Sequence, residues 1–436
     1  MKLFRIFITL LITLLIVIGF TPEAWAFCGF YVAKADTKLY NQASQVVIAR
    51  DGDRTILTMA NDYQGEVKDF ALVVPVPVVL QQEQVRVGDP KIIKRLDDFS
   101  APRLVEYFDP DPCASSGNGG YITLTGRDRL GSRLSSGAIN SLGVTVEARF
   151  SVEEYDVLIL SAKESNGLET WLKQNGYQLP QGASQLLRPY IRQNMKFFVA
   201  KINLEEFDKT GSQFLRPLMI AYESPRFMLP IRLGMMNATS EQDLIVYVLS
   251  PKGQAEITNY RTVNIPSDAE IPVFIKDEFN DFYKAMFQTA YIREGKNAVF
   301  REYAWDMASC DPCSAEPLNR EELKKAGVFW LTPNTSNNVF ITRLHVRYTR
   351  QKFPEDLMFQ ETSNHQQFQG RYILRHPFTG EMKCEAGKEY QRSLSARFEQ
   401  EAQTLARLTV WKLDDIRQKI NLAQSQQVRW WRTIWP

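Results

Sequence analysis

The first 26 residues decide the compartment in which the rest of this chain folds, and therefore how its cysteines behave. Lys2 and Arg5 precede an unbroken apolar run over residues 6–20, and Ala24-Trp25-Ala26 follows with small residues at the positions of a cleavage site. This order of features is typical of a secretory signal peptide. A retained membrane anchor is the alternative, although the run is shorter than the roughly 20 residues that span a bilayer. We therefore predict cleavage after Ala26 and export to the periplasm or the extracellular space.

The overall charge limits the classes of partner. The formal net charge is only +2, from 52 basic and 50 acidic residues. A nucleic-acid-binding protein concentrates basic residues on one face, so we expect no nucleic-acid partner. Hydrophobic residues make up 44% of the chain, which is ample for a packed core and excludes wholesale disorder.

Strand patterns and helix patterns occupy separate stretches of the chain. Two apolar runs, 46–48 and 56–59, flank Asp51-Gly52-Asp53 and predict a β-hairpin. Further strand-like runs lie at 70–77, 197–200, 218–222, 227–233, 244–249 and 339–348. Helices are predicted at 166–175, 183–193, 277–292 and from Asn319, where Glu322 completes a capping box and Gly327 ends the helix. This mixture predicts an α+β fold whose sheets are mixed but largely antiparallel, with separate helices.

The C-terminal region is predicted to form one long amphipathic helix. No Gly or Pro lies between residues 388 and 435, and apolar residues recur every three or four positions. The helix ends in Trp430, Trp431 and Trp435, which either lock it onto the body or make a peripheral membrane contact. We favour packing on the body, because the helix is only modestly basic.

Three regions follow from these patterns. They are a signal peptide at 1–26, an α+β region at 27–395 and the C-terminal helix with its tail at 396–436. The composition changes to Gly and Ser after residue 109, so a break between two subdomains would fall near 109–143 or 150–165.

The five cysteines are candidates for disulfides or for redox chemistry, because an exported protein folds in an oxidising compartment. They are Cys28, Cys113, Cys310, Cys313 and Cys384. Cys310 and Cys313 have the C-x-x-C spacing of thiol oxidoreductases, but the following Ser314-Ala315-Glu316-Pro317 breaks the helix that such a site requires. We therefore favour a structural role. The tripeptide Asp-Pro-Cys occurs at both 111–113 and 311–313, which suggests Cys113 as a bridge partner without settling the connectivity.

No sequence pattern specifies a cofactor or a metal. A zinc site needs four ligands, but the chain offers one C-x-x-C pair, and the other candidates, Cys384 and His376, do not form a second close pair. The sequence therefore gives only a weak zinc signal, and we expect no cofactor. His345 lies in an alternating strand between Leu344 and Val346, and we interpret it as a structural or surface residue. Nucleotide-binding and hydrolase fingerprints are missing from the sequence, so the catalytic residues, if the chain has any, are not identified.

Several segments together resemble one bacterial family. They are Cys28-Gly29-Phe30, residues 168–180, 189–191 and 197–203, the C-x-x-C segment and, most specifically, TRLHVRYTRQKFPEDL at 342–357. The family is the one called domain of unknown function 2330, and the similarity extends over residues 27–395. The resemblance implies an exported bacterial protein and supplies no activity or ligand. Some members end in a membrane anchor, where this chain has the Trp-rich helix instead.

Three functions are compatible with these features. We favour an exported, non-catalytic binding or structural component of the cell envelope, whose partner the sequence does not identify. The first alternative is a thiol-disulfide protein that uses Cys310 and Cys313. The second is a hydrolase or peptidase whose site is assembled from distant residues. A structure separates the three functions. An exposed C-x-x-C at the start of a helix would support redox chemistry, a polar cleft with a perturbed His or carboxylate would support hydrolysis, and the absence of both would support binding.

Overall fold

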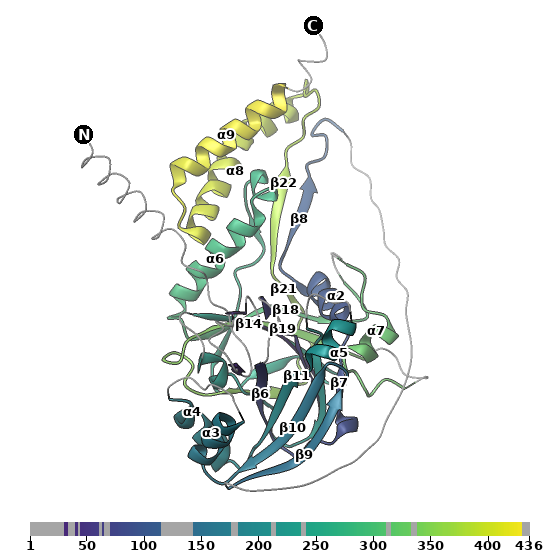
Figure 1. Ribbon diagram of the computed structural model, residues 1–436. Helices are drawn as coiled ribbons and strands as arrows, with labels where there is room; N and C mark the ends of the chain where they lie inside the picture. Colours follow the sequence, from purple (N-terminus) through teal and green to yellow (C-terminus); the bar gives the residue numbers. More distant parts are fainter. Residues whose placement is uncertain are drawn as a thin grey trace, which may run out of the picture.

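The computed structural model describes residues 30–33, 40–41, 44–60, 63–64, 70–114, 143–175, 182–210, 215–236, 241–310, 315–332 and 338–429. Strands and separate helices both contribute, and most neighbouring strands are antiparallel, so the predicted α+β class is confirmed. Figure 1 shows the two large sheets in the lower part of the molecule and a group of helices at its upper end.

The first large sheet has five strands in the order β1-β6-β11-β10-β9, all antiparallel. Their bounds are β1 Phe30–Ala33, β6 Phe70–Val76, β9 Val144–Val152, β10 Tyr155–Ala162 and β11 Lys196–Ile202. Helices α3 (Ser165–Gln174) and α4 (Ala183–Arg192) cover one face, where Leu168, Leu187 and Phe197 share an apolar cluster. This is the usual way in which a sheet buries an apolar face.

The second large sheet has nine strands and supports the candidate site. Eight of them follow the order β16-β18-β19-β14-β3-β4-β12-β7, and β21 pairs with β18. The bounds are β3 Ser44–Asp51, β4 Arg54–Ala60, β7 Val85–Val87, β12 Leu218–Glu223, β14 Gln242–Ser250, β16 Arg261–Asn264, β18 Ala298–Asp306, β19 Phe340–Tyr348 and β21 Phe368–Gln369. The predicted hairpin around Gly52 is confirmed as β3–β4. Only β14–β3 and β16–β18 are parallel pairs within this sheet.

The two large sheets pack face to face around the main apolar core. Val74 and Phe198 of the first sheet contribute to it, as do Leu57, Val246 and Leu344 of the second. All five side chains are at most 3% exposed. The opposite face of the nine-stranded sheet carries two further clusters, one under α2 (Pro90–Ser100) and α7 (Arg320–Lys325), and one under α6 (Phe279–Arg293).

Smaller elements complete the fold. A three-stranded sheet joins β17 (Ala269–Glu270), β22 (Arg371–His376) and β8 (Arg103–Phe108) in parallel, and the last two rise beside the helices in Figure 1. A second small sheet joins β13 (Met228–Leu229), β20 (Leu357–Glu361) and β15 (Ala255–Ile257). The remaining elements are β2 (Tyr40–Asn41) with β5 (Tyr63–Gln64), α5 (Leu204–Lys209), η1 (Gln82–Gln84), η2 (Arg232–Met236) and η3 (Val273–Lys276).

The C-terminal region differs from the single long helix that its sequence predicts. It forms two helices, α8 (Glu385–Thr409) and α9 (Leu413–Arg429), separated at Val410, which has a left-handed φ of 61°. Leu405 of α8 and Ile416 of α9 are both at most 2% exposed and belong to the same apolar cluster as α6. Burying the apolar stripes of both helices on one core explains why the chain breaks where propensity alone would continue the helix.

Candidate functional site

A groove opens on the face of the nine-stranded sheet beside α7. It contains a cavity of about 770 Å³, and an adjoining cavity of about 550 Å³ shares five lining residues with it: Ile56, Glu83, Gln84, Ala221 and Phe329. Both volumes lie in the range of ordinary ligand pockets. The floor is formed by β4 and β12, because Ile56 is paired directly with Ala221 across the two strands. Residues that are directly paired in a sheet point to the same face, so these side chains form one apolar surface.

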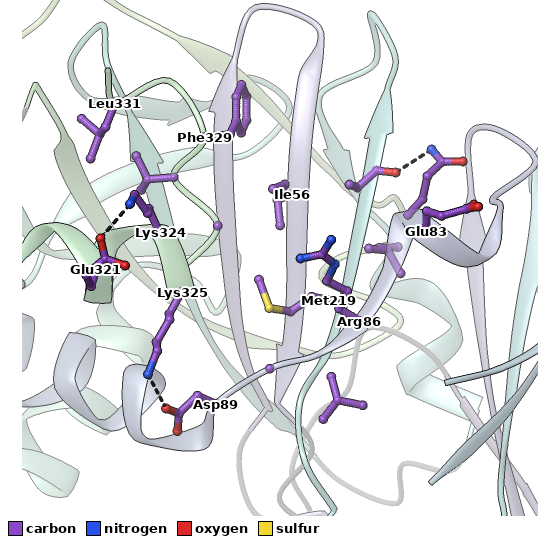
Figure 2. A pocket seen from close by; sticks show the side chains of 17 residues that line it. Ile56, Glu83, Arg86, Asp89, Met219, Glu321, Lys324, Lys325, Phe329 and Leu331 are labelled. Carbon is purple, nitrogen blue, oxygen red and sulfur yellow. Dashed lines mark hydrogen bonds and ion pairs between the residues drawn. The ribbon is translucent and has the colours of Figure 1, made fainter. Parts of the chain in front are cut away.

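Two chain segments form the walls, and a glycine brings each of them close to the floor. Residues 83–89 form one wall, and a Cβ on Gly88 would lie 3.2 Å from the Cγ of Met219. Residues 327–331 form the other, where Gly327 has a φ of +96° and a Cβ there would lie 2.8 Å from Ile56. Only glycine adopts this φ and this close approach without strain. Figure 2 shows Ile56 and Met219 between the two walls.

Local sequence signals hold α7 beside the groove. The predicted capping box is confirmed: Asn319 Oδ1 accepts from the Glu322 amide at 3.0 Å, and Glu322 Oε2 accepts from the Asn319 amide at 2.8 Å. Glu322 also accepts from Arg95 Nε of α2 at 2.9 Å. This contact with Arg95 is the main reason why the pKa of Glu322 is lowered. The helix that carries the wall is thus fixed at its first turn.

Charged side chains surround the apolar floor. Lys324 pairs with Glu321 at 2.7 Å, and Lys325 pairs with Asp89 at 3.4 Å, as Figure 2 shows. Among the residues that the structure describes, Arg86 of β7 has no such partner, although it lines the same cavity. An apolar floor between charged rims is the arrangement of a binding surface.

A second polar cluster lies on the same face of the sheet, and its central side chains, His345, Asp243 and Glu302, are buried. His345 of β19 contacts two carboxylates: its Nδ1 lies 2.8 Å from Glu302 Oε1, and its Nε2 lies 2.9 Å from Asp243 Oδ1. Burial alone would lower the pKa of His345, but the charges of Glu302 and Asp243 outweigh burial and raise it. Because both ring nitrogens face carboxylate oxygens, both carry protons and the ring is an imidazolium.

The cluster is balanced in charge. Arg343 pairs with Glu302 and with Asp97, in both cases at 2.6 Å, and Arg347 pairs with Asp243 at 2.6 Å. Burial would raise the pKa of Glu302, but the charge of Arg343, followed by that of His345, lowers it to about 2. Three cations therefore face three carboxylates.

Aromatic rings close this cluster. The ring of Phe287 of α6 stacks on His345 with centroids 3.8 Å apart, and the Tyr283 hydroxyl donates to Glu302. The side chain of His345 is 8% exposed and that of Glu302 is 0% exposed. A substrate has no access to groups buried in this way. The structure thus places His345 in a buried ion network, in line with its interpretation as a structural residue.

The structure describes three of the five cysteines. Cys113 is bonded to Cys384 across 271 residues of sequence, with a Cα–Cα distance of 5.9 Å. The suggestion that Cys113 joins the C-x-x-C segment is therefore wrong, because the fold brings the end of β8 to the first residues of α8. Cys310 is also disulfide-bonded, whereas Cys28 and Cys313 lie outside the described residues.

The remaining sequence candidates do not gather at one place. His376 Nε2 lies 2.8 Å from Glu106 Oε2, and the ring stacks on Phe108. In the described parts of the chain, no three Cys, His, Asp or Glu residues are grouped so that they could hold a metal ion. None of the helices there is long and apolar enough to cross a membrane. The signal segment and the three tail tryptophans lie outside the described residues.

Sequence reasoning missed the groove. Its floor and walls come from residues 54–56, 83–89, 219–223 and 321–331, which are far apart in the chain. The capping box at Asn319 and the glycines at 88 and 327 were local signals of the walls, but none of them indicates which segments face each other.

Comparison with known proteins assigns the family. Searches of curated proteins and of solved structures give no match to this chain. One family model matches residues 22–360, which is well over half of the chain, and it ends in β20, before the helices α8 and α9. The expectation from the sequence motifs was a region of 27–395. The chain belongs to this family, described as uncharacterized proteins conserved in bacteria (DUF2330).

Proposed function

We propose that this protein is an exported, non-catalytic component of the cell envelope that binds an extended polypeptide segment in the groove over β4 and β12. The observation that carries the proposal is the groove itself. Its floor of Ile56, Met219 and Ala221 is apolar, and its two adjoining cavities follow the same strands. Such a floor accepts apolar side chains, while the charged rims suit the polar main chain of a peptide better than a purely apolar ligand.

The signal-like N-terminus supports export, and the distribution of titratable groups supports binding. Glu302, whose pKa is lowered to about 2 in the His345 cluster, is fully buried and already accepts hydrogen bonds from Arg343 and His345. A catalytic acid or base needs contact with a substrate, which the buried His345 and Glu302 do not offer. The groove offers contact, but its lining side chains are mainly aliphatic, aromatic and ion-paired.

Filling the groove tests the proposal. Ala221 lines both cavities and is half-buried, so Ala221→Trp would occupy the floor with an indole. The matched control is Arg149→Trp, which adds the same indole at an exposed position on β9, outside the groove. The mature protein is immobilised and incubated with a random decapeptide library, and captured peptide is quantified by mass spectrometry. Thermal melting checks that each variant is folded.

The wild type and Arg149→Trp should capture peptide, and folded Ala221→Trp should capture at least about fivefold less, because it lacks an accessible apolar floor. Equal capture by all three proteins would show that the groove is not the binding site. Export is tested separately: the protein recovered from the envelope fraction or the medium should begin at Phe27. Retention of residues 1–26 would contradict it.

A further inference from the structure

Arg86 is the feature of the groove that the proposed function does not use. It is the central residue of β7 and is paired directly with Met219 of β12. Because paired residues of neighbouring strands point to the same face, Arg86 and Met219 both face the groove. Figure 2 shows the guanidinium beside the side chains of Met219 and Ile56. A cation thus lies at the edge of the apolar floor.

The other charges of the groove are already matched. Glu321 is paired with Lys324, and Asp89 with Lys325. Glu83 also has an interaction partner. In the part of the chain that the structure describes, the guanidinium of Arg86 has neither an ion pair nor a hydrogen bond, although the residue is exposed in the groove. The groove therefore presents one unmatched positive charge next to an apolar surface.

We propose that the polypeptide bound in the groove carries a carboxylate that pairs with Arg86, together with an apolar side chain that packs on Ile56, Met219 and Ala221. This inference rests on the proposed function and names the chemistry of the bound segment. The planar guanidinium presents parallel N–H donors that match the two oxygens of a carboxylate. The charge complementarity selects an acidic segment among the apolar peptides that the floor would accept.

The experiment uses the same decapeptide library with the variants Arg86→Glu and Arg149→Glu. Both replace an exposed arginine on a strand, but only Arg86 lines the groove. Peptides captured by the wild type should be enriched in Asp and Glu relative to the input, and their capture should weaken as salt increases. Arg86→Glu should capture acidic peptides at least about fivefold less, and Arg149→Glu should behave as the wild type.

Repeating the capture with an amidated library identifies the source of the carboxylate. If the acidic enrichment persists, the bound carboxylate belongs to an Asp or Glu side chain. If amidation abolishes capture, the bound carboxylate is the peptide's C-terminus. Both results support the inference. The inference is overturned if Ala221→Trp blocks capture but the captured peptides show no acidic preference and Arg86→Glu has no effect. That result would leave the proposed function intact. Capture that is insensitive to Ala221→Trp overturns the proposed function itself.

Discussion

Removing the charge of Glu302 should destabilise the protein more than removing any exposed carboxylate. Glu302 is 0% exposed and accepts from Arg343 Nε at 2.6 Å and from His345 Nδ1 at 2.8 Å. Glu302→Gln leaves the two buried cations with one carboxylate fewer. A pKa lowered from 4.5 to about 2 corresponds to about 3 kcal/mol of stabilisation at neutral pH, since each pKa unit is worth about 1.4 kcal/mol. Breaking other buried ion pairs costs a similar ~3–5 kcal/mol.

The pH dependence gives this prediction a second, independent readout. Because the folded state holds the pKa of Glu302 below its unfolded value, the stabilisation is complete above pH 4.5 and is lost as the pH falls towards 2. Urea unfolding followed by tryptophan fluorescence at pH 7 and over pH 3–5 measures both effects. The difference between wild type and Glu302→Gln should therefore shrink as the pH falls.

The matched control is Glu206→Gln, which removes an exposed partner of Lys209 and should cost less than about 1 kcal/mol. The assignment of Glu302 as an ionised, stabilising carboxylate would be refuted by either of two results. One is a decrease of less than about 1 kcal/mol in the unfolding free energy of Glu302→Gln, and the other is a pH dependence of stability identical to that of the wild type.

Three further predictions concern other parts of the fold. Because the folded state raises the pKa of His345, the protonated ring should stabilise the fold below pH 6.5 and lose this contribution as the pH rises further. Urea unfolding of His345→Gln should show no such loss of stability with rising pH. Cys113→Ser opens a loop of 271 residues and should lower stability by about 4 kcal/mol, whereas a wild-type melting temperature in that variant would contradict the bond to Cys384. Ile416→Ala should cost about 2–5 kcal/mol in urea unfolding, since α9 packs on the core at this residue, while Lys412→Ala serves as the exposed control.

Features that depend on neighbouring residues were predictable from the sequence. The β3–β4 hairpin follows from Gly52 between two apolar runs, and the start of α7 follows from the pair Asn319 and Glu322. The helix predicted over 277–292 corresponds to α6, because its apolar spacing extends over four turns. In each of these cases the information lies within one short, continuous segment of the chain.

Features that depend on distant pairings were not predictable in the same way. The repeated Asp-Pro-Cys tripeptide suggested a partner for Cys113, but the bond to Cys384 is set by how β8 and α8 meet in the folded molecule. The break at Val410 occurs without Gly or Pro, because burial of α9 on the core outweighs local propensity. The groove likewise exists only after β12 and β7 have paired.

The ion network has a consequence for strand pairing. Along β19, Leu344 and Val346 point into the apolar core between the sheets, while Arg343, His345 and Arg347 point to the other face. A shift of the strand by one residue would exchange the two faces and place three cations between the sheets. Each would cost several kcal/mol to desolvate without a partner, and the three costs together are comparable to the whole net stability of a typical domain. The charges therefore exclude every alignment of β19 with β14 and β18 that is shifted by an odd number of residues.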